Sequence, residues 1–237
     1  RAIITELAGL KNVKLVAVCD TQQTRADGAA KRVQPNAEAF TDHRAMLDKR
    51  KDLAAVIVAT PTHLHAAPAV DSVAAGLHVY CEAPLAHSIA ECGVIAKAAR
   101  GSKKVFQVGH LGRANPIYKL ARKFFRSDSV RDLAHAEAQW FQKTSWRQSV
   151  SDASRDREAN WRLDDELSTG LAGEQGSHQI DVVDWYTEEI PESIIGAGSI
   201  RLHNDGRKVA DTISLMLRYK AGWSLTYNAS LANSFQG

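Results

Sequence analysis

The amino-acid sequence predicts an α/β protein in two parts: a doubly wound, mainly parallel sheet over residues 1–112, and an α+β domain with an open, mostly antiparallel sheet over residues 113–237. Two observations carry this prediction. In the first part, short apolar runs alternate with helical stretches, and each run is continuously hydrophobic, as in parallel strands buried on both faces. Near the end of the chain, apolar and polar residues alternate, which is typical of antiparallel strands with one solvated face.

Four apolar runs in the first part are expected to form one parallel sheet. They are Val13–Asp20, Ala54–Thr60, His78–Glu82 and Val105–Gly109. Helical patterns cover five stretches before and between these runs: Arg1–Leu10, Thr21–Val33, His43–Lys51, Ala66–Gly76 and Ile89–Arg100. Ser88 and Glu91 have the spacing of a capping box at the start of the last helix. This regular alternation predicts a doubly wound sheet.

The second part is expected to combine helices with strands of alternating polarity. Helices are predicted over Asn115–Arg126 and Glu174–Tyr186, a strand over Asp132–Phe141, and a polar loop over Ser145–Asn160. At the end of the chain, two alternating runs are joined by Lys220-Ala221-Gly222, which predicts an antiparallel hairpin. The two runs are Asp211–Tyr219 and Trp223–Ser230.

Composition excludes several classes of protein. Hydrophobic residues make up 44% of the chain and charged residues 24%, as in ordinary globular proteins. The longest apolar runs, such as Leu53–Thr60, fall far short of the roughly 20 residues that span a membrane. The net charge of +3 forms no basic stripe, so we expect no nucleic-acid partner.

Cysteine usage bears on location. Cys19 and Cys81 end apolar runs, and the three cysteines contain no Cys-x-x-Cys pair, so we expect Cys19 and Cys81 to be buried, reduced thiols. Reduced thiols are typical of a cytoplasmic protein. An exported form with a cleaved signal stays open, because the chain starts at Arg1 rather than at a methionine.

Asp20 is a candidate cofactor-binding residue because it ends the run Val13–Asp20, which we interpret as the second strand of a nucleotide-binding unit. At that position a carboxylate can accept both hydroxyls of an adenosine ribose and repel a 2′-phosphate. The alternative is that Asp20 only caps the helix that follows. In such units a strand and a Gly-rich turn precede the helix predicted over Arg1–Leu10, and the sequence holds neither. We therefore expect truncation at the N-terminus, and weak dinucleotide binding by the chain as given, because the turn holds the pyrophosphate. The C-terminus, at Gly237, is expected to be short too.

Four motifs carry a resemblance to a known family. Ala59–His65 and Cys81–Pro84 follow predicted parallel strands, at the edge where such sheets bind ligands. Trp161-Arg162 and Gly176–Asp181 come later in the chain. In this order and spacing, the four motifs resemble those of the glucose–fructose oxidoreductase / inositol dehydrogenase / MocA (Gfo/Idh/MocA) family, over essentially the whole chain.

The resemblance implies a Rossmann domain that binds NAD or NADP and a C-terminal α/β domain whose sheet covers the nicotinamide. With Asp20 present, NAD is expected and NADP is less favoured. A set of residues in the motifs is expected to bind the cofactor. They are Asp20, Thr60, Pro61, Thr62, His65, Glu82, Ala83, Trp161 and Arg162.

The resemblance also indicates where the chemistry lies. The Glu-Lys-Pro motif of the family is carried as Glu82-Ala83-Pro84, so the lysine that usually acts on the substrate hydroxyl is replaced by Ala83. The second family motif, an acid four residues before a histidine, is carried as Glu174 and His178, which would share one helix face. We therefore predict His178 as the general base, with Glu174 or Asp181 holding it.

The predicted reaction is hydride transfer between nicotinamide and a carbon of a sugar, cyclitol or glycoside. Two alternatives stay open: a redox-neutral, NAD-dependent glycosidase-type enzyme, which the loss of the lysine favours, and a non-catalytic cofactor-binding regulator. No metal site is predicted, because His63 and His65 lack a third convergent ligand. We expect a carbohydrate-like substrate, no membrane partner, and a homo-oligomer formed through the C-terminal sheet.

Overall fold

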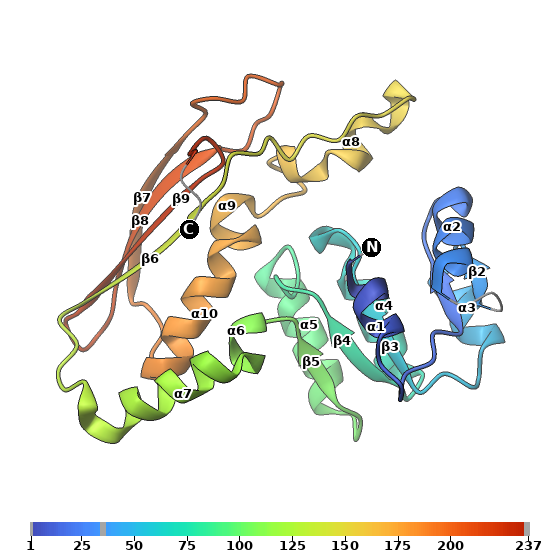
Figure 1. The fold of residues 1–237 in the computed structure, drawn as a ribbon, viewed down its shortest axis with the longest axis horizontal. Helices are drawn as coiled ribbons and strands as arrows, with labels where there is room; N and C mark the ends of the chain where they lie inside the picture. The colour runs from blue at the N-terminus through green and yellow to red at the C-terminus, as the bar shows by residue number, and fades with distance from the viewer. Residues whose placement is uncertain (1, 34–36, 235–237) are drawn as a thin grey trace. The chain divides into compact units, whose positions relative to one another are not determined.

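A computed structural model describes residues 2–33 and 37–234 of the chain. It contains two compact units, neither of which is continuous in sequence (Figure 1). Unit 1 comprises Arg1–Val58, Ala66–Cys81 and Gly93–Gln107, and unit 2 comprises Ala59–His65, Glu82–Cys92 and Val108–Gly237. Two loops that follow strands of unit 1, Ala59–His65 and Glu82–Cys92, thus belong to unit 2. The predicted domain boundary at residue 112 divides the chain into two continuous parts, and it stays a prediction.

Unit 1 consists of short parallel strands and helices. Strand β1 (Ala17–Cys19) pairs in parallel with β2 (Glu38–Phe40). Strand β3 (Ala55–Val58) pairs in parallel with β4 (His78–Cys81), and β5 (Phe106–Val108) lies on the other side of β4. Five helices precede or connect these strands in the chain, the last of them beginning in unit 2. They are α1 (Ala2–Ala8), α2 (Gln23–Val33), α3 (His43–Lys49), α4 (Ala66–Ala74) and α5 (Ile89–Arg100).

The prediction of one continuous sheet in the first part is wrong. The strands form a two-stranded sheet, β1-β2, and a three-stranded sheet, β3-β4-β5. In the usual doubly wound order 3-2-1-4-5-6, these pieces correspond to strands 3-2 and 4-5-6. No strand among the described residues occupies the position of strand 1, which would join the two pieces by hydrogen bonds.

Local sequence signals in the first 112 residues are confirmed with two exceptions. The capping box is confirmed, since Glu91 N donates to Ser88 Oγ and Ser88 N donates to Glu91 Oε2, each over 3.2 Å. Strand β2 was not predicted, because a run of three residues carries no periodicity. Cys81 is buried as expected, whereas Cys19 is exposed, contrary to the expectation, because it lies at the end of a three-residue strand.

Unit 2 is built on a four-stranded sheet with the order β6-β9-β8-β7. The strands are β6 (His135–Phe141), β7 (Ser193–Ser199), β8 (Thr212–Arg218) and β9 (Ser224–Ser230). Strand β6 runs parallel to β9, and the other two pairings are antiparallel, so the mostly antiparallel sheet and the β8–β9 hairpin are confirmed. Strand β7 was not predicted, because it is almost entirely exposed and contains two glycines.

One face of this sheet carries the hydrophobic core. The side chains of Leu217, Leu225, Tyr227 and Ala229 alternate with outward-facing ones along β8 and β9 and are fully buried. Helices α9 (Gly170–Glu174) and α10 (Gly176–Thr187) contact the strands (Figure 1). The long alternating runs therefore bury their apolar side chains on one face of the sheet, as the hydrophobic pattern predicts.

The helices of unit 2 depart from prediction in their boundaries. The helix predicted over Glu174–Tyr186 starts at Gly176 as α10, because Glu174 is the last residue of α9 and Gln175 separates the two helices. The polar loop predicted over Ser145–Asn160 contains a short helix, α8 (Asp156–Ala159). After β5, the chain forms α6 (Leu111–Ala114), which was not predicted, and then α7 (Pro116–Phe124).

A buried carboxylate fixes the connection between β7 and β8. Asp211 is fully buried and accepts hydrogen bonds from the backbone N–H groups of Arg201 (2.9 Å), Leu202 (2.9 Å) and His203 (3.0 Å). Burial raises the pKa of Asp211, but these N–H donors together outweigh burial and hold the pKa below its ordinary value. The ionised carboxylate therefore stabilises the fold at neutral pH.

We expect Asp211→Ala to lower the free energy of unfolding by about 3 kcal/mol at neutral pH, because three buried N–H groups lose their acceptor. A lowered folded-state pKa gives stability that is present at neutral pH and is lost as the pH falls through that pKa. The difference between parent and variant in urea denaturation should therefore shrink in acid. Asp132→Ala, an exposed change in the same unit, is the control. A deficit that is equal at neutral and acid pH would contradict the role given to the ionised carboxylate.

Candidate functional site

A buried glutamate links the loop after β3 to helix α9. Glu174 is 6% exposed, and its Oε1 accepts hydrogen bonds from Thr62 Oγ1 (3.0 Å) and Thr169 Oγ1 (2.8 Å). Its other oxygen, Oε2, lies 3.6 Å from Nε of Arg162. Three residues from separate segments of unit 2 thus meet at one carboxylate, and two of them, Thr62 and Arg162, are predicted cofactor residues.

The close packing around Glu174 depends on a glycine. A Cβ added at Gly173 would lie 2.2 Å from Thr169 Oγ1, which is far inside any real contact. A larger residue at this position would displace the hydroxyl that Thr169 donates to Glu174. The small residue before Glu174 therefore preserves one of its two hydroxyl donors.

His65 ties together two loops that follow parallel strands. It is 1% exposed, and its Nδ1 lies 2.9 Å from the carbonyl oxygen of Pro84 and 3.3 Å from that of Leu85. Its Nε2 lies 2.9 Å from the carbonyl oxygen of Thr60. The sequence predicted a cofactor contact for His65, but the structure directs its ring toward backbone carbonyls of these loops.

The residues that carry the Glu-x-Pro motif are half-buried. Glu82, Ala83 and Pro84 follow β4, and the Ala83–Pro84 peptide bond is cis. Ala83 offers only a methyl group, so any proton acceptor has to come from elsewhere. In unit 1, Asp20 accepts a hydrogen bond from Gln22 N over 2.9 Å, so it caps the turn before α2. That bond involves Oδ1 and does not test the predicted contact of Asp20 with a ribose.

Trp161 and Arg162 form a small aromatic and cationic group. The guanidinium carbon of Arg162 lies 4.5 Å from the centre of the Trp161 ring, which is within cation–π range. The His63 ring meets Trp161 edge-on, with 5.6 Å between ring centroids. Burial is the main cause that lowers the pKa of His63, and His87 lowers it further. At neutral pH, a larger fraction of His63 is therefore uncharged than for a histidine with an ordinary pKa.

His178, the predicted base, lies in the first turn of α10. Its Nδ1 is enclosed and has no hydrogen-bond partner, and its ring is 6.0 Å from that of His110. Neither predicted helper binds it: Glu174 bonds to the two threonines, and Asp181 accepts hydrogen bonds from Nε and Nη2 of Arg113, both at 2.8 Å. The break at Gln175 explains the first difference, because Glu174 and His178 end up on separate helices.

Several polar atoms of unit 2 are enclosed without a hydrogen-bond partner. They are His63 Nδ1, His110 Nδ1, Arg147 Nε, Ser177 Oγ, His178 Nδ1, Gln179 Oε1 and Tyr227 OH. Unpartnered buried polar groups are costly and gather where a ligand or water completes them. Burial also raises the pKa of Tyr227, so its hydroxyl stays protonated.

Sequence reasoning did not assign His110 or Tyr227 to the site. His110 had a usable signal, since it follows a parallel strand at the edge where such sheets bind ligands. Tyr227 had none, because an aromatic residue on an alternating strand is indistinguishable from core.

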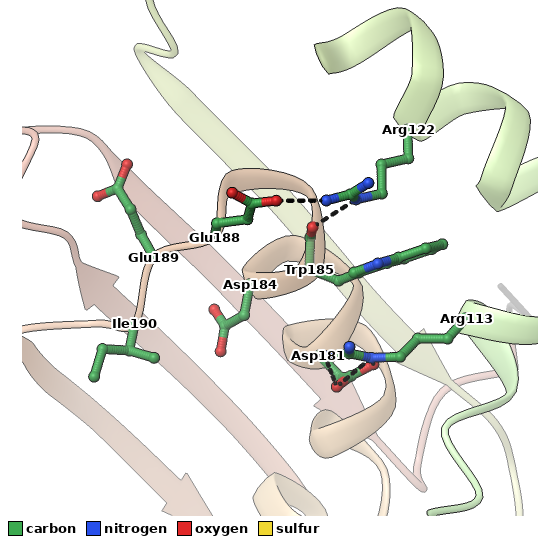
Figure 2. A pocket seen from close by; sticks show the side chains of 8 residues that line it. All are labelled: Arg113, Arg122, Asp181, Asp184, Trp185, Glu188, Glu189 and Ile190. Atoms are coloured by element: carbon green, nitrogen blue, oxygen red, sulfur yellow. Dashed lines mark hydrogen bonds and ion pairs between the residues drawn. The ribbon is translucent and has the colours of Figure 1, made fainter. Parts of the chain in front are cut away.

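The second half of α10 lines a cavity of about 400 Å³. Figure 2 shows the Trp185 ring between Arg113 and Arg122, whose guanidinium carbons lie 5.8 and 5.1 Å from it. Both cations are already paired, Arg113 with Asp181 and Arg122 with Glu188. The lining residues thus comprise two cations, both already paired, and four acids, Asp181, Asp184, Glu188 and Glu189.

The described residues contain no group of three or more His, Cys, Asp or Glu side chains arranged to hold a metal ion. Among the same residues, no helix is long and apolar enough to cross a bilayer.

Both parts of the chain match models of one protein family. Residues 3–110 match the oxidoreductase family with an NAD-binding Rossmann fold, GFO_IDH_MocA. Residues 118–236 match the GFO/IDH/MocA C-terminal domain.

Curated relatives carry the names of several kinds of enzyme. A glycosyl hydrolase family 109 protein of Shewanella putrefaciens is 28% identical over 67% of this chain and 36% of its own length. Levoglucosan dehydrogenase of Pseudarthrobacter phenanthrenivorans is 27% identical over 63% of this chain and 36% of its own length. The chain thus spans just over a third of the length of these relatives.

Solved structures share the fold. The oxidoreductase domain protein of Kribbella flavida is 26% identical, with a TM-score of 0.78 over 94% of this chain and 60% of that one. The WlbA dehydrogenase of Bordetella pertussis, in complex with NADH and UDP-GlcNAcA, is 22% identical, with a TM-score of 0.83 over 100% of this chain and 71% of that one. With both of its parts matched, the chain belongs to the Gfo/Idh/MocA family of oxidoreductases with an NAD-binding Rossmann domain.

Proposed function

We propose that the protein containing this chain is a nicotinamide-dependent oxidoreductase that transfers hydride between NAD and a CH–OH carbon of a carbohydrate-like substrate. The observation that carries the proposal is the cluster of enclosed, unpartnered polar atoms at the start of α10, around His178. Imidazole, hydroxyl and amide groups are the types that a polyhydroxylated ligand satisfies. Family membership supplies the reaction class.

The same atoms support a fit to a nicotinamide dinucleotide. His63 Nδ1, next to Trp161, and Gln179 Oε1 need partners of the kind that carboxamide and ribose groups offer. Residues proposed to hold the cofactor are those of the motifs, namely Asp20, Thr60, Pro61, Thr62, Glu82, Ala83, Trp161 and Arg162, with His65 holding two of their loops together. A bound nicotinamide supplies the hydride acceptor, and the protein orients it.

In this proposal His178 accepts the proton of the substrate hydroxyl. A neutral imidazole is suited to this at neutral pH, and Ala83 provides no amine that could compete. Glu174 and Asp181 then act as positioning residues rather than direct helpers of His178. Glu174 holds Thr62 and Thr169, and Asp181 is held by Arg113.

We expect His178→Ala to lower kcat by about 10²–10⁴-fold with nearly unchanged NAD affinity, because a general base is lost and no cofactor contact is removed. Steady-state kinetics on a panel of sugars and cyclitols, with calorimetry of NAD binding, measures both. His135→Ala on β6, where the ring is exposed to solvent, is the matched control. If kcat of His178→Ala stays within a few-fold of the parent, the base has to be sought in the polar segment Lys143–Asn160.

We expect tighter binding of NAD than of NADP, because the carboxylate of Asp20 repels a 2′-phosphate. Asp20→Ser should narrow the preference by improving NADP binding, whereas Asp27→Ala, an acid on the neighbouring helix α2, should leave it unchanged. Comparative calorimetry with both dinucleotides measures the ratio. Tighter binding of NADP by the parent would contradict the prediction, and Arg25 would then be the first cation to examine.

A second function has its own support. Ala83 replaces the lysine of the usual family motif, and several curated relatives carry the name glycosyl hydrolase family 109. A redox-neutral glycosidase oxidises a sugar carbon, eliminates the substituent, adds water and reduces the carbon again. Such an enzyme releases sugar from a glycoside without net formation of NADH, whereas a dehydrogenase forms NADH in proportion to the substrate that it oxidises. Cofactor binding without turnover of either kind would favour a non-catalytic regulator.

We also propose that the protein forms a homo-oligomer through the outer face of the sheet of unit 2. Ile195 and Met216 are exposed there and oppose each other on β7 and β8. The same face carries polar pairs, such as Ser214 with Asn228 over 2.7 Å. Light scattering tests the proposal. The cytoplasmic location stays a prediction from cysteine usage.

A further inference from the structure

His110 is held against helix α10 by a close helix contact. It directly precedes α6, and α6 packs on α10. A Cβ added at Gly112 would lie 2.4 Å from Cγ2 of Val182, so only glycine allows this approach. The two helices are therefore close enough for the His110 ring to meet the ring of His178, with 6.0 Å between centroids and an angle of 72° between planes.

The carboxylate of Asp181 lies near the His110 ring. Oδ2 of Asp181 lies 3.8 Å from His110 Nδ1. Asp181 comes three residues after His178 on α10 and is fixed by Arg113 through two hydrogen bonds of 2.8 Å. A nearby carboxylate favours the tautomer with the proton on Nδ1 and stabilises the ring when it becomes charged.

The imidazole rings of His110 and His178 have an environment that no other pair of histidine rings among the described residues has. Each Nδ1 is enclosed without a hydrogen-bond partner, and the rings face each other edge to face. Two imidazolium ions at this separation repel each other, so a proton on one ring opposes a proton on the other.

We propose that His110 is a positioning residue that acts through His178: the two rings form one acid–base unit that is neutral in its base form and takes up one additional proton in its acid form, with Asp181 stabilising the charge on the His110 side. This rests on the proposed function of His178. The proton taken from the substrate hydroxyl enters the unit, while the electron pair of the C–H bond leaves as hydride to the nicotinamide. The unit regains its base form when that proton passes to solvent.

The charges around His110 come from both helices packed on it. Burial is the largest cause that lowers its pKa, and Asp181 opposes burial by raising the pKa. His178 on α10 and Arg113 on α6 lower the pKa further. Removing His178 should therefore raise the titration midpoint of His110, and removing the charge of Asp181 should lower it.

NMR titration of the histidine rings tests the coupling without requiring turnover. In the protein containing this chain, we expect the midpoint of His110 to rise in His178→Asn, to fall in Asp181→Asn, and to stay unchanged in the control His135→Asn. The pH profile of kcat/KM should shift in His110→Asn, which a purely structural role would not produce.

An unchanged midpoint of His110 in His178→Asn would overturn the proposal, even where His178→Ala has lost activity. A raised midpoint together with a fully active His178→Ala would show that the two rings titrate as a pair but would overturn their role in the reaction, along with the assignment of His178 as the base. The two failures are thus separable.

Discussion

The buried carboxylate of Glu174 is the interaction on which the arrangement of the site in unit 2 depends. It accepts hydrogen bonds from the hydroxyls of Thr62 and Thr169 and lies 3.6 Å from Nε of Arg162. It therefore joins the N-terminal cap of its own helix and the nearby Arg162 segment to a loop that lies 112 residues earlier in the sequence. A buried charge is tolerated only where such partners compensate it. The partners and the carboxylate therefore hold one another in place.

This interaction explains why the acid and the histidine of the family motif diverge. On one continuous helix, Glu174 and His178 would share a face. The chain instead ends α9 at Glu174 and starts α10 at Gly176. The acid turns toward the threonines, while His178 meets His110 and has no carboxylate of its own. The acid and the histidine of one motif thus belong to two different groups of contacts, one around Glu174 and one around His178.

The predictable parts of the fold are those with long periodic signals. The hairpin of β8 and β9 and the helices around His43 and Ile89 follow directly from alternation, helical spacing and the Ser88–Glu91 box. Strand β2 and the helix α6 span three and four residues, too few for any period to be visible. Whether β1 and β3 belong to one sheet depends on the presence of a strand between them, and local sequence patterns do not report the order of strands in a sheet.

The sequence selected candidate residues for the site but not the hydrogen bonds that these residues make. Strand ends and motifs pointed to Thr62, His65, Arg162 and His178, all of which lie in unit 2. Some of their partners were not readable, because the hydrogen bond between Thr62 and Glu174 joins residues that lie 112 positions apart in the sequence. His110 had a signal in its place after a parallel strand, but its contact with His178 depends on the close approach of α6 to α10 at Gly112, which the sequence does not show.

The parallel pairing of β6 with β9 has a consequence for the order of folding. His135 on β6 bonds to Ser224 on β9, 89 residues later in the chain. On a ribosome, β6 emerges first and remains without its partner until β9 has been made. The β8–β9 hairpin closes locally and provides the template on which β6 later docks. Completion of this sheet is therefore a late event, and the β6 edge is exposed to wrong pairing until it occurs.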